Sequence, residues 1–135
     1  MSAKTPATAS LKVKRVYQPP DDDDGTRILV DRLWPRGLTK QKARVDLWLK
    51  DIAPSDTLRR RFHGHPEKWS AFVAGYAREL KQEPAKSAAA DLRKRIRREH
   101  VTLLFAARDE AHNNAVALRD WLKHKGWQRA RRYSS

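Results

Sequence analysis

Apolar residues recur along the chain in two patterns, the alternation typical of strands and the three- to four-residue spacing typical of helices. Strands are predicted over four segments: 11–17, 27–30, 45–49 and 101–105. The segments 27–30 and 101–105 are almost continuously apolar, as expected for strands buried on both faces of a parallel sheet. The segment 45–49 is ambiguous, because Trp48 and Ile52 would also suit a helix that continues to Asp51.

Helical spacing lies between and after these strands. Five helices are predicted, beginning at Thr39, Ser55, Pro66, Pro84 and Glu110. The first two end near Arg44 and Phe62. The third is the clearest, because apolar residues recur along one face: Trp69, Phe72, Val73, Tyr76 and Leu80. Gly126 is placed to end the last helix after His124.

Strands separated by helices favour parallel pairing, because a parallel crossover needs an intervening element. The predicted fold class is therefore α/β, a single three-layer domain with a small, mainly parallel sheet of about four strands flanked by helices. This domain is expected to span residues 11–127. Residues 1–10 are small and polar and predict a disordered N-terminal tail, and residues 128–135 form a basic C-terminal tail.

Composition narrows the class of protein. The chain is 39% hydrophobic and 34% charged, which is too apolar for disorder and too charged for a membrane protein. No segment approaches the roughly 20 apolar residues of a spanning helix, and no secretory signal is recognisable. We therefore expect no membrane partner and a cytoplasmic location. The absence of cysteine excludes disulfides, thiolate nucleophiles and thiolate metal sites.

The charge balance suggests a class of partner. Thirty Lys and Arg residues against sixteen Asp and Glu residues give a net charge of +14, and such a field attracts polyanions. The excess lies in the second half, where segments 86–98 and 119–132 each hold six basic residues and one Asp. A nucleic-acid partner is one explanation, and an arginine-rich surface without a specific role is the other.

Two loops are candidates for the functional site, because ligands in parallel sheets bind beyond the carboxyl ends of the strands. One loop follows the strand 27–30 and runs from Asp31 to Gly37, and the other follows the strand 101–105 and runs from Arg108 to Asn114. If the two strands are neighbours, these loops face each other. Candidate ligand-binding residues are Arg32, Trp34, Arg36, Arg108, Asn113 and Asn114.

Arginine suits phosphate or carboxylate recognition, and a helix N-terminus adds backbone donors, so the loops predict an anion pocket. Asp31, Asp109 and His112 are the candidate catalytic residues, as acid, base or orienting group. The structural alternative pairs Asp31 with Arg32 or Arg36, buries Trp34 in the core and makes Asp109 a helix cap. Whether the site carries out a reaction stays open.

Metal and cofactor sites are not expected. Four adjacent residues, Asp21 to Asp24, cannot all face one ion, and they predict a solvated turn before Gly25. His63 and His65 lack a carboxylate at a typical ligand spacing. No glycine-rich phosphate loop and no Gly-x-Ser-x-Gly elbow is present, which disfavours nucleotide hydrolysis, dehydrogenase and serine hydrolase chemistry.

Several blocks together resemble a known family. These blocks are residues 13–17, 24–25, 28–37, 48–55, 62, 65–69 and 101–114. On these blocks the chain resembles the YeaO-like proteins, the short branch of domain-of-unknown-function family 488, from about Leu11 to Leu122. The resemblance implies the fold more than a function. The longer branch is similar at Asp31, Arg32 and Pro35 but carries cysteines near the second strand end, so no thiol chemistry is implied for this chain.

These observations predict a YeaO-like protein that binds a small anionic ligand, phosphate- or nucleotide-like, at the loops 31–37 and 108–114. One alternative is a nucleic-acid-binding module that uses the basic second half of the chain. Another is a structural or partner-binding protein without catalysis. The sequence does not indicate an oligomeric state.

Overall fold

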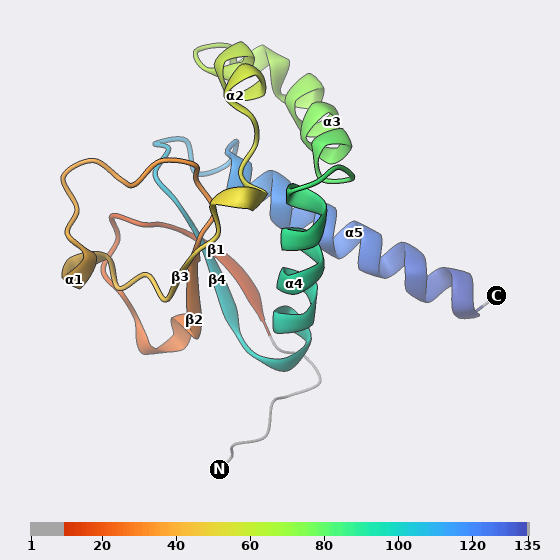
Figure 1. The fold of residues 1–135 in the computed structure, drawn as a ribbon, viewed down its shortest axis with the longest axis horizontal. Coiled ribbons are helices and arrows are strands. Elements are labelled where there is room, and N and C mark those ends of the chain that lie inside the picture. Colours follow the sequence, from red (N-terminus) through yellow and green to blue (C-terminus); the bar gives the residue numbers. More distant parts are fainter. Residues whose placement is uncertain (1–9, 135) are drawn as a thin grey trace.

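The computed structural model describes residues 10–134, with side chains over residues 10–124, and has a four-stranded parallel sheet as its centre (Figure 1). The strands are β1 (Leu11–Arg15), β2 (Thr26–Leu29), β3 (Leu47–Trp48) and β4 (Val101–Phe105). Their order is β1-β4-β2-β3, and every pair is parallel. The predicted α/β class with a parallel sheet is confirmed. The predicted tail at residues 1–10 lies almost wholly outside the described residues.

Strand β4 occupies an inner position in the sheet, and its five residues are all buried. It pairs with β1 on one side and β2 on the other, so that Leu103 lies opposite both Val13 and Ile28. An unbroken apolar run can be accommodated only where both faces of a strand are covered. The almost continuously apolar run 101–105 therefore predicts this inner position correctly.

Within residues 10–134, five α-helices and three short 3-10 helices accompany the sheet. The α-helices are α1 (Lys40–Ala43), α2 (Asp56–Phe62), α3 (Trp69–Glu79), α4 (Ala85–Arg98) and α5 (Asn114–Ser134). The 3-10 helices are η1 (Asp22–Asp24), η2 (Lys50–Ile52) and η3 (Pro66–Lys68). Thr39 and Ser55 cap α1 and α2 as predicted. No helix in the described part of the chain is long and apolar enough to cross a membrane.

Two predicted boundaries are wrong. The last helix starts at Asn114 rather than near Glu110, and it continues past Gly126, which was expected to end it. The ambiguous segment 45–49 contains the two-residue strand β3, and the residues directly after it form the 3-10 helix η2. Strand and helix, the two alternatives for this segment, therefore follow each other along the chain.

The two faces of the sheet are covered unequally. On one face Ile28 and Leu103 share a large core with the buried residues of α3, α4 and α5. On the other face Leu29 and Leu104 pack with Ala43 of α1 and with the partly buried Trp34 and Trp48. The third layer is thus a long connecting segment with one turn of helix. Helices α2 and α3 project beyond the carboxyl ends of the strands (Figure 1).

The acidic turn before β2 departs from its prediction as a fully solvated loop. Asp24, the last residue of η1, is only 1% exposed. Its carboxylate accepts hydrogen bonds from the buried Arg27 at 2.5 Å, from Lys14 at 3.1 Å and from the Asp21 backbone amide at 3.0 Å. Burial alone would raise the pKa of Asp24, but these hydrogen bonds outweigh it and hold the pKa below its usual value.

Candidate functional site

The two strand-end loops singled out from the sequence line one cleft of about 730 Å³. Residues that follow all four strands contribute to it, from Tyr17 after β1 to Ala53 and Pro54 after β3. The remaining wall comes from α2, the turn that follows it and α3, through Arg59, residues 62–66 and Phe72. This location matches the rule for parallel sheets, because the inner strands β2 and β4 are neighbours.

Asp31 holds the two loops together at the floor of the cleft. One carboxylate oxygen accepts the Ala106 backbone amide at 2.9 Å, and the other accepts the Asn114 side-chain amide at 3.0 Å. The same Asn114 amide also donates to the Val30 carbonyl at 3.0 Å. Burial raises the pKa of Asp31, although the hydrogen bonds from Asn114 and Ala106 and the charge of Arg59 act in the opposite direction. Asp31 thus links the end of β2 to the end of β4.

The Arg32 and Arg36 side chains differ in what they contact, and neither pairs with Asp31 as the structural alternative supposed. Arg32 lies 3.8 Å from the carboxylate of Asp56 and donates to the Pro54 carbonyl at 3.4 Å. Arg36 sits in the turn Pro35–Leu38, where Gly37 adopts a φ of 76° that favours glycine. The Tyr17 hydroxyl donates to the Arg36 carbonyl at 2.8 Å and so fixes this turn.

Two guanidinium groups in the cleft are uncommitted. Within residues 10–124, the side chains of Arg36 and Arg108 have no hydrogen-bond or ion-pair partner, and both residues are exposed. Arg59 is paired with Asp56 at 3.3 Å. The lining of the cleft holds four arginines and two aspartates, so these side chains carry an excess of positive charge when all are ionised.

The second loop is ordered by its own side chains. Asp109 accepts the backbone amides of Ala111 and His112 at 2.9 and 3.0 Å, and these bonds lower its pKa. Its other oxygen lies 3.3 Å from Nδ1 of His112. Asn113 is buried and caps α5, accepting the Val116 amide and donating to the Asp109 carbonyl. Both polar ends of the Asn113 side chain are therefore used within the protein.

Trp34 is half-buried and has a structural partner at each end. Its indole nitrogen donates to the Leu38 carbonyl at 2.6 Å, and its ring meets Trp48 edge-on at 5.4 Å. Trp48 in turn donates to the Asp31 carbonyl at 2.8 Å. The ring of Trp34 also lines the cleft. The structure therefore places it between the core of the thin third layer and the candidate site.

A cluster of three aromatic rings, each in contact with the other two, forms the wall on the side of α2 and α3. Phe62 and Phe72 line the cleft and stack on each other with ring centroids 4.8 Å apart. Trp69 stacks on Phe72 at 5.7 Å and meets the ring of His112 edge-on at 5.0 Å. The last contact joins α3 to the second loop.

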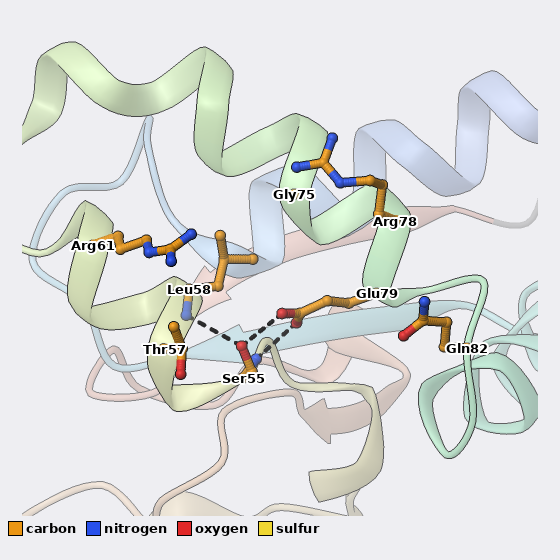
Figure 2. A pocket seen from close by; sticks show the side chains of 8 residues that line it. All are labelled: Ser55, Thr57, Leu58, Arg61, Gly75, Arg78, Glu79 and Gln82. Atoms are coloured by element: carbon orange, nitrogen blue, oxygen red, sulfur yellow. Dashed lines mark hydrogen bonds between the residues drawn. The ribbon is translucent and has the colours of Figure 1, made fainter.

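The position of this wall depends on how α2 is attached to α3. Figure 2 shows Ser55 and Glu79 facing each other: Glu79 accepts the Ser55 amide at 2.8 Å and the Ser55 hydroxyl at 2.6 Å. The Ser55 hydroxyl also caps α2 by accepting the Leu58 amide at 3.1 Å. Gly75 lets Leu58 approach closely, since a Cβ at Gly75 would lie 2.8 Å from the Leu58 methyl group. These contacts aim the end of α2, and with it Phe62, at the cleft.

Metal binding finds no support in the described part of the chain, where no group of three or more His, Asp or Glu side chains could hold an ion. His65 pairs with Glu67 at 3.3 Å, and Asp24 faces cationic side chains. His63 and His65 line the cleft, so they belong to the candidate site in another capacity.

Several lining residues were not predicted from the sequence: Tyr17, Arg59, Phe62, His63, His65 and Phe72. Tyr17 follows a strand and could have been found by the strand-end rule. The others lie on or beside α2 and α3, and the sequence holds no signal that brings these helices over the strand ends. The roles assigned to the predicted residues stay predictions.

Comparisons with known proteins give the family. The chain is 43% identical over 115 residues to the uncharacterized protein YeaO of Escherichia coli (strain K12), covering 84% of this chain and 97% of that protein. It is 44% identical over 108 residues to the uncharacterized proteins Rv3073c of Mycobacterium tuberculosis (strain H37Rv) and Mb3100c of Mycobacterium bovis, covering 80% of this chain and 89% of each relative.

No solved structure matches the chain. The sequence profile described as "Inactive DUF488-N3 subclade" matches residues 10–135. The chain therefore belongs to the YeaO-like DUF488 family, in the inactive DUF488-N3 subclade.

Proposed function

We propose that this protein binds a small anionic, phosphate-like ligand in the strand-end cleft and acts by binding rather than by catalysis. The observation that carries the proposal is the pair of uncommitted guanidinium groups, Arg36 and Arg108, on the two loops that meet there. Arginine presents several donors in one plane, which matches the oxygens of a phosphate group. A ligand between these loops would give both side chains the partner they lack.

The carboxylates of the cleft support binding over acid–base chemistry. Both oxygens of Asp31 accept hydrogen bonds that hold the loops, so removing a proton from a ligand would compete with these bonds. Asp109 accepts two backbone amides, which stabilise its charged form and make it a weaker base. The description of the subclade as inactive is consistent with a cleft that holds cations but no free carboxylate base.

Inorganic phosphate is the probe for this proposal, followed by the shifts of backbone amides in a nuclear magnetic resonance titration at constant ionic strength. We expect shifts at residues 31–37 and 106–114. Replacing Arg36 or Arg108 with Gln removes a charged hydrogen bond worth roughly 1.5–3 kcal/mol, so affinity falls about tenfold or more. The control is Arg97→Gln, which removes the same charge from the exposed face of α4. Equal losses in all three variants would show that only net charge matters.

A second candidate function is nucleic-acid binding, and the surface of α4 supports it. Lys86, Lys94, Arg97 and Arg98 are exposed, and none forms an ion pair with a residue in the range 10–124. Their spacing places them along one side of the helix. Such a stripe can contact phosphates of a nucleic-acid backbone without reading its sequence.

Fluorescence anisotropy with single- and double-stranded oligonucleotides at several salt concentrations tests this second function. Affinity should fall steeply with salt, and Arg97→Gln should reduce the slope of the logarithmic plot by about one contact. Arg108→Gln is the matched control, since it lies in the cleft. The absence of binding at low salt would remove this candidate.

A further inference from the structure

The cleft has an aromatic wall that a bare phosphate would not use. Phe72 is 4% exposed and supports Phe62, which is only half-buried and lines the cleft. The two rings stack at 4.8 Å with 30° between their planes, and Trp69 contacts both, with its ring centroid 5.5 Å from Phe62 and 5.7 Å from Phe72. Because each ring is held by its neighbour, Phe62 is fixed before any ligand arrives. A fixed ring at the edge of a cleft is suited to stacking against another planar group.

Exposed apolar side chains gather at the same cleft. Among the described residues, the large hydrophobic side chains that are exposed are Leu33, at 66%, and Tyr17, at 40%. Both line the cleft. Isolated exposed apolar residues are ordinary, but here they share one hollow with Phe62. An apolar ligand surface would cover them, whereas an inorganic anion would not.

We propose that the ligand is a nucleoside monophosphate, with its base against the Phe62 wall and its phosphate at Arg36 and Arg108. This inference rests on the proposed function, which requires only the anion. The two parts of the ligand correspond to the two kinds of lining: arginines on the strand-end loops and aromatic rings from α2 and α3. The cleft of about 730 Å³ falls within the range of roughly 300–1,000 Å³ usual for small-molecule sites.

The wall also offers polar groups beside the stacking ring. His63 follows Phe62 and lines the cleft, and its side chain has no hydrogen-bond partner within residues 10–124. A neutral imidazole has one donor and one acceptor, and it can therefore pair with the edge of a base. His65 lines the same part of the cleft but is engaged with Glu67. His63 is thus the free polar group nearest in sequence to the aromatic platform.

Calorimetric titration of the full chain with AMP, UMP and ribose 5-phosphate tests the inference. These probes share a phosphomonoester and differ in whether they carry a base. We expect AMP and UMP to bind about tenfold or more tightly than ribose 5-phosphate, as stacking on an aromatic side chain would provide. Phe62→Leu should abolish this margin and leave the affinity for ribose 5-phosphate unchanged. Phe62→Tyr keeps the ring and should retain the margin.

The outcomes separate this inference from the proposed function. If the three compounds bind equally, and Phe62→Leu changes nothing, the base is not recognised and only the phosphate site stands. If none of them binds, and inorganic phosphate causes no shifts, the proposed function fails and this inference fails with it. The unfolding midpoint of Phe62→Leu is compared with that of the wild type to show that the variant is folded. A folded Phe62→Leu variant that still binds AMP tenfold more tightly than ribose 5-phosphate would overturn the role of the ring.

Discussion

Asp31 offers a test of whether one carboxylate holds the candidate site together. We expect Asp31→Ala to destabilise the protein by about 2–4 kcal/mol, because the wild-type carboxylate accepts two hydrogen bonds and each bond to a charged group contributes roughly 1.5–3 kcal/mol before the cost of burying that charge. In this variant the Ala106 amide loses its acceptor, while Asn114 keeps its bond to the Val30 carbonyl.

Asp31→Asn should cost less than Asp31→Ala, because the new amide has the same shape and its oxygen can still accept the Ala106 amide. Its nitrogen would meet the Asn114 amide nitrogen, so one of the two bonds is lost. Against this loss, the neutral side chain avoids the cost of burying a charge, the same cost that raises the pKa of Asp31. We therefore expect the order wild type, Asp31→Asn, Asp31→Ala from most to least stable at acidic pH.

The pH dependence follows from the direction of the shift. A carboxyl group whose pKa is higher in the folded than in the unfolded protein stabilises the fold when protonated, and this contribution is lost as the pH rises through the folded pKa. The advantage of the wild type over Asp31→Asn should therefore shrink between about pH 4, near the ordinary pKa of Asp, and neutral pH.

Urea unfolding followed by circular dichroism at several pH values measures these differences. With a slope of about 2 kcal/mol per molar urea, the middle of the usual range, the Asp31→Ala midpoint should shift by roughly 1–2 M. Asp22→Ala is the control, since Asp22 is exposed and carries the same charge. A midpoint for Asp31→Ala that equals the wild-type value would refute the view that this carboxylate ties the loops together.

Three further changes test other parts of the structure. Asp24→Ala leaves the buried Arg27 without its carboxylate and should cost about 3–5 kcal/mol in urea unfolding. This loss of stability should shrink as the pH falls below about 4, because the pKa of Asp24 is lowered in the folded protein. An effect as small as that of Asp22→Ala would contradict this prediction. Ser55→Ala removes both the cap of α2 and the hydrogen bond from the Ser55 hydroxyl to Glu79, so it should cost about 2–3 kcal/mol by the same assay. Thr57→Ala in the first turn of α2 should be nearly neutral. Asp109→Asn removes a negative charge from the cleft while keeping a capping oxygen, so it should tighten phosphate binding in the resonance titration; weaker binding would mean that the carboxylate itself serves the ligand.

The sequence predicts the inner sheet well because the signal there is local. The runs 27–30 and 101–105 are almost continuously apolar, and they largely coincide with the two inner strands β2 and β4. The edge segment 45–49 is harder to predict, because part of its pairing uses a side chain: the Asp46 carboxylate accepts the Arg27 amide at 2.8 Å. Such a bond extends the contact between segments without lengthening the strand, and no periodicity records it.

The start of α5 shows how a capping signal can mislead. Asp109 and Glu110 are typical of a helix start, and they predict one near residue 110. In the structure Asp109 instead caps a preceding turn, and the helix begins at Asn114 with Asn113 as its cap. Both positions carry a good capping residue, so the choice between them depends on packing, including the contact of His112 with Trp69.

The candidate site was predictable where it depends on topology and not where it depends on helix packing. The convergence of the loops after β2 and β4 follows from parallel neighbouring strands. Phe62 and Arg59 reach the same cleft only because Glu79 holds Ser55 and because Gly75 lets Leu58 approach α3. These are contacts between residues about twenty positions apart, which no local pattern along the chain indicates.

The side chains of the cleft divide into those that hold the loops and those that face the ligand space, and this division has a measurable consequence. Asp31 and Asn114 form hydrogen bonds with backbone groups and with each other. The guanidinium groups of Arg36 and Arg108, in contrast, have no hydrogen-bond or ion-pair partner within residues 10–124. Arg108→Gln should therefore lower phosphate affinity and leave the urea midpoint unchanged. Asp31→Asn should move the midpoint at acidic pH while changing phosphate affinity less than Arg108→Gln does. If Arg108→Gln destabilised the fold instead, that arginine would be part of the scaffold, and the argument for an anion site would lose one of its two cations.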